Sequence, residues 1–206
     1  MNLEIMEFIE SQILPRYKEF GVSHGIRHAQ SVINESLTLA KLLGADEDMA
    51  YVVAAYHDLG LSGPRAIHHI TSGKILFADA RLKKWFTTEQ LRIMKEAVED
   101  HRASTSHQPR SIYGKIVAEA DRELKMETVF VRAIQYGLEH YPEMNEDAQW
   151  ERFYDHMREK YSENGYIRLW IPNSPNEQRL KEIRNVIADK CELKKYFDNF
   201  YKELND

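Results

Sequence analysis

Apolar residues recur every three or four positions along almost the whole chain, which is the spacing of one buried face of an α-helix. No stretch sustains the alternation of apolar and polar residues that a half-buried strand requires. The pattern therefore predicts an all-α fold. The expected helices are one from residue 3 to the break near Gly21-Val22-Ser23, and others over about 26–43, 48–59, 66–78, 89–101, 111–125, 128–140, 145–161 and 175–204.

The turn between the second and third helices carries clear signals. Gly44 follows the last apolar position of 26–43 and is expected to end that helix, and Asp46 is suited to cap the next one. A connection this short predicts that the two helices are antiparallel neighbours. Gly60 is expected to end the helix over 48–59.

Two further helices begin with the signature of a capping box, in which a Ser or Thr is followed three residues later by Glu or Gln. Thr87 and Gln90 predict the start of the helix over 89–101. Ser174, Pro175 and Glu177 predict the start of the last helix, with proline in its first turn.

The 206 residues contain neither a Gly/Ser-rich linker nor an internal repeat, which predicts one domain over 1–206 with 126–206 as a C-terminal extension. The longest apolar run, eight residues from Met49 to Tyr56, is too short to cross a membrane. The first fourteen residues hold three Glu and no Lys or Arg, unlike a signal peptide. Because the single Cys191 cannot form an internal disulfide, a cytoplasmic location is expected.

Charge is distributed unevenly along the chain. The net charge is −5, which argues against a nucleic-acid polymer as partner, yet residues 60–125 hold twelve Lys and Arg against eight Asp and Glu. Seven of the nine histidines fall between residues 24 and 107. This positive section favours a small anionic ligand such as a phosphate ester, and a solvated face of ordinary surface lysines is the alternative.

The candidate chemistry begins with His57 and Asp58, which directly follow the apolar run 52–56. Asp121 likewise has Val117 and other apolar neighbours one helical turn away. Buried carboxylates need positive charge or several donors, and with His28 on the adjacent helix they suggest a divalent cation. Two neutral imidazoles and two carboxylates balance a 2+ ion, and mixed N and O ligands suit Mn, Fe, Co, Ni or Zn better than Ca.

Three phrases in this order resemble the HD superfamily of metal-dependent phosphohydrolases. The resemblance covers about residues 20–125 and implies an HD-type helical bundle in which the metal ligands are His28, His57, Asp58 and Asp121. The phrases are His24-Gly25-Ile26-Arg27-His28, Ala54-Ala55-Tyr56-His57-Asp58-Leu59-Gly60 and Ile116-Val117-Ala118-Glu119-Ala120-Asp121.

Additional histidines are similar to those of HD subgroups that use them for a second metal or for phosphate contacts. His68 fits the spacing to the apolar pair Ile75-Leu76, whereas His69 fits the spacing to Gly73. His101, with Arg102 beside it, resembles the next histidine of those subgroups. The resemblance therefore implies one or two ions per chain, with His68 and His101 as the ligands of a second.

The resemblance implies hydrolysis of a small phosphate ester, with nucleotides as one class of substrate. Asp58 or Asp121 would orient a metal-bound water, and His24 would contact the substrate or act as an acid, unless it only caps its helix. The residues proposed to stabilise the phosphoryl group, each of which could equally form a surface ion pair, are Arg27, Arg102, Lys115 and Arg122.

Two other functions compete with this reading. A degenerate HD module would bind a nucleotide or a partner without turnover, and a di-iron oxygenase of HD type would use bound iron. Leu61 departs from single-metal nucleotidases of the superfamily, which place a carboxylate three residues after the Asp of the His-Asp pair. The cofactor is expected among Mn, Fe, Co, Ni, Zn and Mg, and the oligomeric state is left open.

Overall fold

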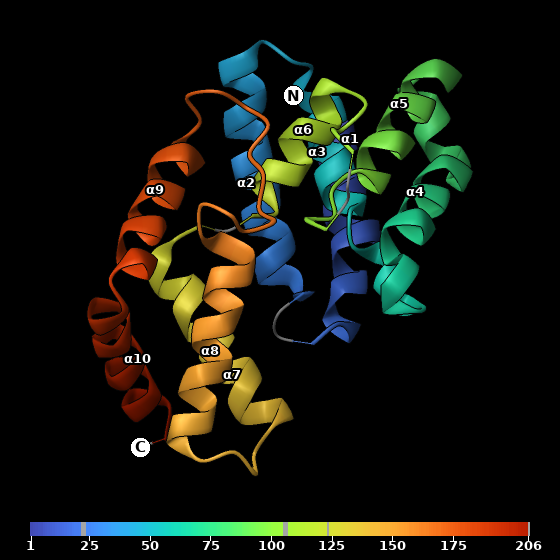
Figure 1. Ribbon diagram of the computed structural model, residues 1–206. Coiled ribbons are helices and arrows are strands. Elements are labelled where there is room, and N and C mark those ends of the chain that lie inside the picture. The colour runs from blue at the N-terminus through green and yellow to red at the C-terminus, as the bar shows by residue number, and fades with distance from the viewer. Residues whose placement is uncertain (22–23, 105–106, 123, 206) are drawn as a thin grey trace. The chain divides into compact units, whose positions relative to one another are not determined.

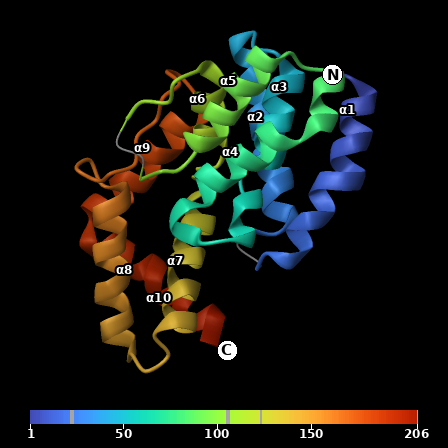
Figure 2. The same ribbon diagram turned by 90° about the vertical axis from the view of Figure 1, so that its right-hand side faces the viewer.

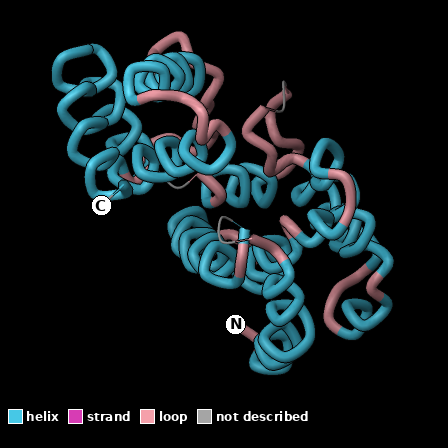
Figure 3. Tube along the Cα trace, turned by 90° about the horizontal axis from the view of Figure 1, so that it is seen from below, coloured by secondary structure: helices cyan, strands magenta, loops and turns pink. Residues whose placement is uncertain are grey.

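The computed structural model describes residues 1–21, 24–104, 107–122 and 124–205, and within these residues every regular element is a helix (Figure 3). The prediction of an all-α fold is confirmed. Val22 and Ser23 of the predicted break lie outside the described residues. None of the described helices combines the length and hydropathy needed to cross a bilayer.

The chain divides into two compact units, Met1–Arg122 and Glu123–Asp206. The first contains all the candidate site residues. The single domain over 1–206 stays a prediction. The elements of the first unit are α1 (Leu3–Phe8), η1 (Ile9–Ile13), η2 (Leu14–Glu19), α2 (Ile26–Leu43), α3 (Glu47–Tyr56), η4 (Leu59–Ser62), η5 (Arg65–Ile67), α4 (His68–Ala78), η6 (Ala80–Lys84), α5 (Thr88–Glu99) and α6 (Ile112–Ala120).

Helix α3 is the core of the first unit because all eight residues from Met49 to Tyr56 are buried. It packs against α2, α5 and α6, with α2 on one side and α5 on the other (Figure 1). The predicted turn is confirmed: Gly44 adopts a left-handed φ of 62°, and Asp46 accepts hydrogen bonds from the backbone N–H groups of Asp48 and Met49. The capping box of Thr87 and Gln90 is also present.

Two predicted helices end earlier than expected. Helix α3 stops at Tyr56 instead of residue 59, because the Asp58 N–H donates to the Tyr17 hydroxyl rather than to Ala54. Helix α6 stops at Ala120 instead of residue 125, so that Asp121 is its C-cap. Both changes place a candidate carboxylate just beyond a helix end.

The first predicted helix is also not a regular α-helix. Pro15 has no backbone N–H to continue the ladder, and the chain widens into a π-helical turn over Ile9–Ile13 before narrowing to a 3-10 helix over Leu14–Glu19. This irregular segment places the buried Tyr17 beside the end of α3.

The second unit consists of α7 (Met126–His140), α8 (Glu146–Tyr161), α9 (Pro175–Ala188) and α10 (Lys190–Asn205). Helices α7 and α8 lie side by side and are joined by a short loop (Figure 2). The buried rings of Phe130, Phe153 and Phe197 form its aromatic core.

The prediction of one continuous helix over 175–204 is wrong. Asp189 has extended backbone (φ −102°, ψ 101°), and its side chain accepts from the N–H groups of Cys191 and Glu192. A side chain that caps the following turn competes with the helical ladder, so α9 ends and α10 begins there. The Glu177 carboxylate accepts from the Asn173 N–H, one residue earlier than in the predicted box.

Candidate metal centre

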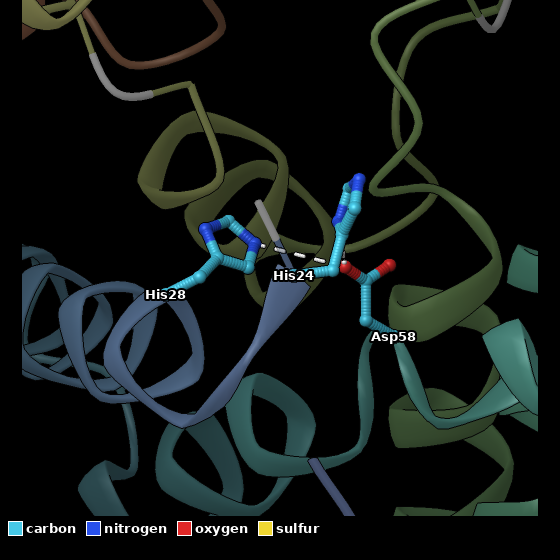
Figure 4. A group of neighbouring side chains, drawn as sticks. All are labelled: His24, His28 and Asp58. Carbon is cyan, nitrogen blue, oxygen red and sulfur yellow. Dashed lines mark hydrogen bonds and ion pairs between the residues drawn. The ribbon is translucent and has the colours of Figure 1, made fainter. Parts of the chain in front are cut away.

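Seven candidate side chains meet where five helices of the first unit end. Helices α3, α5 and α6 point their carboxyl ends at this place, and the dipole at the carboxyl end of a helix favours positive charge. The side chains are those of His24, His28, His57, Asp58, His68, His101 and Asp121, which we call the histidine–aspartate cluster. Figure 4 shows His24 and His28 approaching the Asp58 carboxylate.

One oxygen of Asp58 belongs to the first donor group, which consists of His28, His57, Asp121 and Asp58 Oδ2. His28 Nε2 lies 3.2 Å from His57 Nε2, 3.2 Å from Asp121 Oδ1 and 3.6 Å from Asp58 Oδ2. His57 Nε2 lies 3.4 Å from Asp58 Oδ2 and 3.8 Å from Asp121 Oδ1. The sequence-predicted ligand set therefore converges in space.

The other oxygen of Asp58 belongs to the second donor group, which consists of His68, His101 and Asp58 Oδ1. His68 Nε2 lies 3.1 Å from His101 Nε2, and these two atoms lie 3.4 Å and 3.5 Å from Asp58 Oδ1. His69 is not part of this group: its Nδ1 is buried and has no hydrogen-bond partner among the described residues. Of the two histidines that the sequence left open, the structure brings His68 to Asp58.

These separations fit coordination of a divalent ion. Ligands bound at about 2.1 Å lie about 3.0–4.2 Å from one another around one ion, and the histidine–histidine and histidine–carboxylate distances given above fall in that range. Asp58 contributes one oxygen to each group, so it would supply a ligand atom to an ion held by either.

The proton positions on three of the rings also fit metal binding. The Nδ1 atoms of His57, His68 and His101 lie 2.7, 2.8 and 2.6 Å from the carbonyl oxygens of residues 54, 65 and 98. A carbonyl oxygen only accepts, so each Nδ1 carries a proton and each neutral ring turns its Nε2 lone pair inward. Three lone pairs thus face two carboxylates.

In the absence of an ion, protonated histidines supply part of the positive charge that the buried carboxylates need. Burial lowers the pKa of His28, but acceptance by Asp121 and Asp58 outweighs it and raises the pKa from 6.5 to about 9. The same balance of burial against Asp58 leaves the pKa of His101 raised, whereas burial lowers that of His68. Burial raises the pKa of Asp58 and of Asp121, yet the surrounding histidines hold both well below their ordinary value.

The metal-free protein is expected to lose stability as pH rises from 6.5 to 9. His28 binds its proton more tightly in the folded state, so its contribution is complete below pH 6.5 and disappears as pH passes about 9. The shift corresponds to roughly 3 kcal/mol of unfolding free energy. Thermal unfolding in the presence of a chelator measures this slope. The slope should be smaller in His28→Gln, where only the raised pKa of His101 still contributes in the same direction, and an unchanged slope in that variant would contradict the assignment.

His24 connects the cluster to an arginine at the surface. Its Nδ1 donates to Asp58 Oδ2 at 2.8 Å, and its Nε2 accepts from the Arg65 guanidinium at 3.2 Å. Arginine only donates, so the ring is neutral with its proton on Nδ1. His24 therefore holds Asp58 in place with one nitrogen and meets a cation with the other.

Tyr17 contacts the backbone of Asp58, whereas His24 contacts its carboxylate. Its buried hydroxyl donates to the Ala55 carbonyl at 3.0 Å and accepts from the Asp58 N–H at 3.3 Å. The tyrosine thus links the irregular N-terminal segment to the end of α3, just before the Asp58 carboxylate. Sequence analysis missed this residue because 41 positions separate it from Asp58.

Gly60 allows α4 to approach the His-Asp segment closely. Its N–H donates to the Ser72 hydroxyl at 2.8 Å. A Cβ atom at this position would lie 2.1 Å from the His68 carbonyl oxygen and 2.7 Å from the Ser72 nitrogen. Gly60 is therefore required for the place of His68 and does more than end a helix.

Gly60→Ala is expected to lower the unfolding free energy by ~1–3 kcal/mol and to weaken metal binding at the second donor group, because α4 must move away. Gly63→Ala is the matched control, since a Cβ there meets nothing closer than 3.6 Å. Thermal unfolding and metal content check both variants. Equal stability of the two would show that α4 tolerates the methyl group.

The predicted substrate-binding cations take several positions. Arg102 donates to the Ala66 carbonyl, and the buried Arg122 donates to the Ala118 carbonyl, with burial lowering its pKa. Arg27 is exposed and Lys115 half-buried, and among the described residues neither makes a hydrogen bond or ion pair with the cluster. Their roles toward substrate stay predictions, as does that of His69.

An ion-pair network supports the end of α5 next to His101. The Arg110 guanidinium donates to the buried Asp100 at 2.8 Å and to Glu99 at 3.0 Å. Lys95 pairs with the same Glu99 carboxylate at 2.7 Å. The network ties the loop after α5 back to the helix and so holds the backbone from which His101 projects.

Comparisons with known proteins identify a family model that matches part of the chain. The family model of the HD domain matches residues 25–126. A solved structure that is similar is the crystal structure of a predicted HD superfamily hydrolase from an uncultured Thermotogales bacterium at 1.45 Å resolution. It has a TM-score of 0.49 and 21% sequence identity, with 75% of this chain and 90% of that chain covered. No curated protein sequence matches the chain.

Proposed function

Residues 25–126 of this chain are an HD domain, and from this premise we propose that the protein is a metal-dependent hydrolase of a small phosphate ester, with nucleotides as one substrate class. The observation that carries the proposal is the sharing of Asp58 between two donor groups whose lone pairs converge. The ions would be divalent: Mn, Fe, Co, Ni, Zn or Mg.

The chain offers two sets of ligands for such ions. His28, His57, Asp121 and Asp58 Oδ2 would hold the first, and His68, His101 and Asp58 Oδ1 the second. A bound divalent ion lowers the pKa of its water toward neutrality and polarises a phosphoryl oxygen. Two ions per chain follow from the second donor group, and a single ion would leave His68 and His101 to contact the phosphate.

The remaining chemistry belongs to side chains around the cluster. Asp58 and Asp121 keep low pKa values and so accept hydrogen bonds from an attacking water at neutral pH. His24 lies at the edge of the cluster with 27% of its side chain exposed. Its Nε2 accepts from Arg65 in this structure, so it would first take up a proton there and then pass it to a leaving group. Arg102 would supply positive charge for the non-bridging phosphoryl oxygens.

The test is hydrolysis of a panel of phosphate monoesters, diesters and nucleotides by chelator-treated protein reloaded with each divalent ion. We expect turnover that depends on the ion and disappears again with chelator. No turnover of any compound with any ion would favour a binding module. Bound iron together with an oxygen-dependent reaction would instead favour an oxygenase.

A further inference from the structure

Several arginines of the first unit form ion pairs with carboxylates, whereas Arg65 has no carboxylate partner among the described residues. Arg81, Arg92 and Arg110 pair with acids at 2.6, 3.0 and 2.8 Å. In the described part of the chain no carboxylate lies within ion-pair distance of Arg65, whose guanidinium instead contacts His24 Nε2 at 3.2 Å. An exposed cation is thus held against the rim of the cluster by a neutral ring.

Arg65 is held in place both through its backbone carbonyl and through its side chain. The carbonyl of Arg65 accepts from His68 Nδ1 at 2.8 Å, so the backbone of η5 is tied to the second donor group. Its side chain reaches His24, which donates to Asp58. The guanidinium therefore lies one histidine ring away from the carboxylate that both donor groups share.

We propose that Arg65 binds an anionic oxygen of the substrate, exchanging its hydrogen bond to His24 for one to a phosphoryl group. This proposal rests on the proposed function of the same site. A guanidinium pairs with an anionic phosphoryl oxygen through charge attraction and a bidentate geometry that a neutral imidazole nitrogen does not offer, so the exchange is favourable. It also frees His24 Nε2 to face the substrate.

The exchange has a consequence for substrate class. A guanidinium matches two oxygens of one phosphoryl group, whereas an uncharged ester offers it no comparable partner. Arg65 would therefore favour compounds with a terminal phosphate, which has three non-bridging oxygens and up to two negative charges, over diesters, which have two such oxygens and one charge.

The experiment compares Arg65→Ala with Arg65→Lys and with the control Arg92→Ala, a surface arginine paired with Glu89. Binding of inorganic phosphate to the Mn²⁺-loaded proteins is measured by calorimetry, and KM and kcat are measured with a phosphate monoester. We expect Arg65→Ala to weaken phosphate binding and raise KM by about 10- to 100-fold with kcat changed much less. Arg65→Lys should recover part of the loss, and Arg92→Ala should match the wild type.

The outcomes separate this proposal from the proposed function. Phosphate affinity of Arg65→Ala within twofold of the wild type would overturn it, whether or not the wild type hydrolyses anything. Loss of metal from Arg65→Ala would also overturn it, because the backbone carbonyl that holds His68 is unchanged in the variant and only a structural role of the side chain would explain the loss. A wild type that binds phosphate through Arg65 without turnover would refute hydrolysis alone.

Discussion

Replacing Asp58 by alanine is expected to remove metal from both donor groups and to lower phosphate-ester hydrolysis on the order of 10³-fold or more. Among the residues that the structure describes, Asp58 is the one whose two oxygens face different histidine pairs, His28 and His57 on one side and His68 and His101 on the other. Without it, the first group keeps a single carboxylate and the second keeps none. Metal content by elemental analysis and initial rates at saturating metal measure the two effects.

Two further variants make the result interpretable. Asp58→Asn keeps the shape of the side chain and loses its charge, so it should fold while binding metal weakly. Asp147→Ala, an exposed acid in the second unit, should retain the metal content and rate of the wild type. Full activity of Asp58→Ala would refute the site as described.

The second large effect is expected from His68→Ala, which should reduce two bound ions per chain to one and lower the rate by about 100-fold. His68 Nε2 lies 3.1 Å from His101 Nε2 and 3.4 Å from Asp58 Oδ1, so its loss leaves the second group with two donors. Stoichiometry by elemental analysis and the rate under saturating metal are the measurements.

The neighbouring His69 is the matched control for this experiment. It shares the helix and the residue type, but burial followed by the charges of His101 and His68 lowers its pKa to about 4, and it makes no contact with Asp58. His69→Ala should keep two ions. The opposite result, with His69→Ala losing an ion and His68→Ala keeping both, would reverse the assignment of these two residues.

Local signals in the sequence were sufficient for much of the fold. The start of α3 at Asp46, the stop of α2 at Gly44 and the capping box of Thr87 each depend on residues within a few positions of one another. The break at Asp189 was missed because apolar spacing continues through it, and only the competing side-chain bonds to Cys191 and Glu192 end the helix.

The residues of the candidate site could likewise be predicted from the sequence only in part. His57 and Asp58 could be singled out because they follow a fully apolar helix, and their ligand roles stay predictions that the geometry supports. The choice of His68 over His69 depended on which ring α4 turns toward Asp58, and that is set by the close approach at Gly60. Arg65 and Tyr17 were not found, since contacts across 41 residues leave no spacing to read.

The bonds from His57, His68 and His101 to carbonyl groups three residues earlier bear on how this site could diverge. A carbonyl is present whatever side chain its residue carries, so the identities of Ala54, Arg65 and Val98 are not needed to orient the rings. The side chains at these three positions can therefore change through evolution or in a mutant library while the inward-facing Nε2 atoms of the histidines keep their positions. Selection at residue 65 would retune the preferred anion without rebuilding the centre.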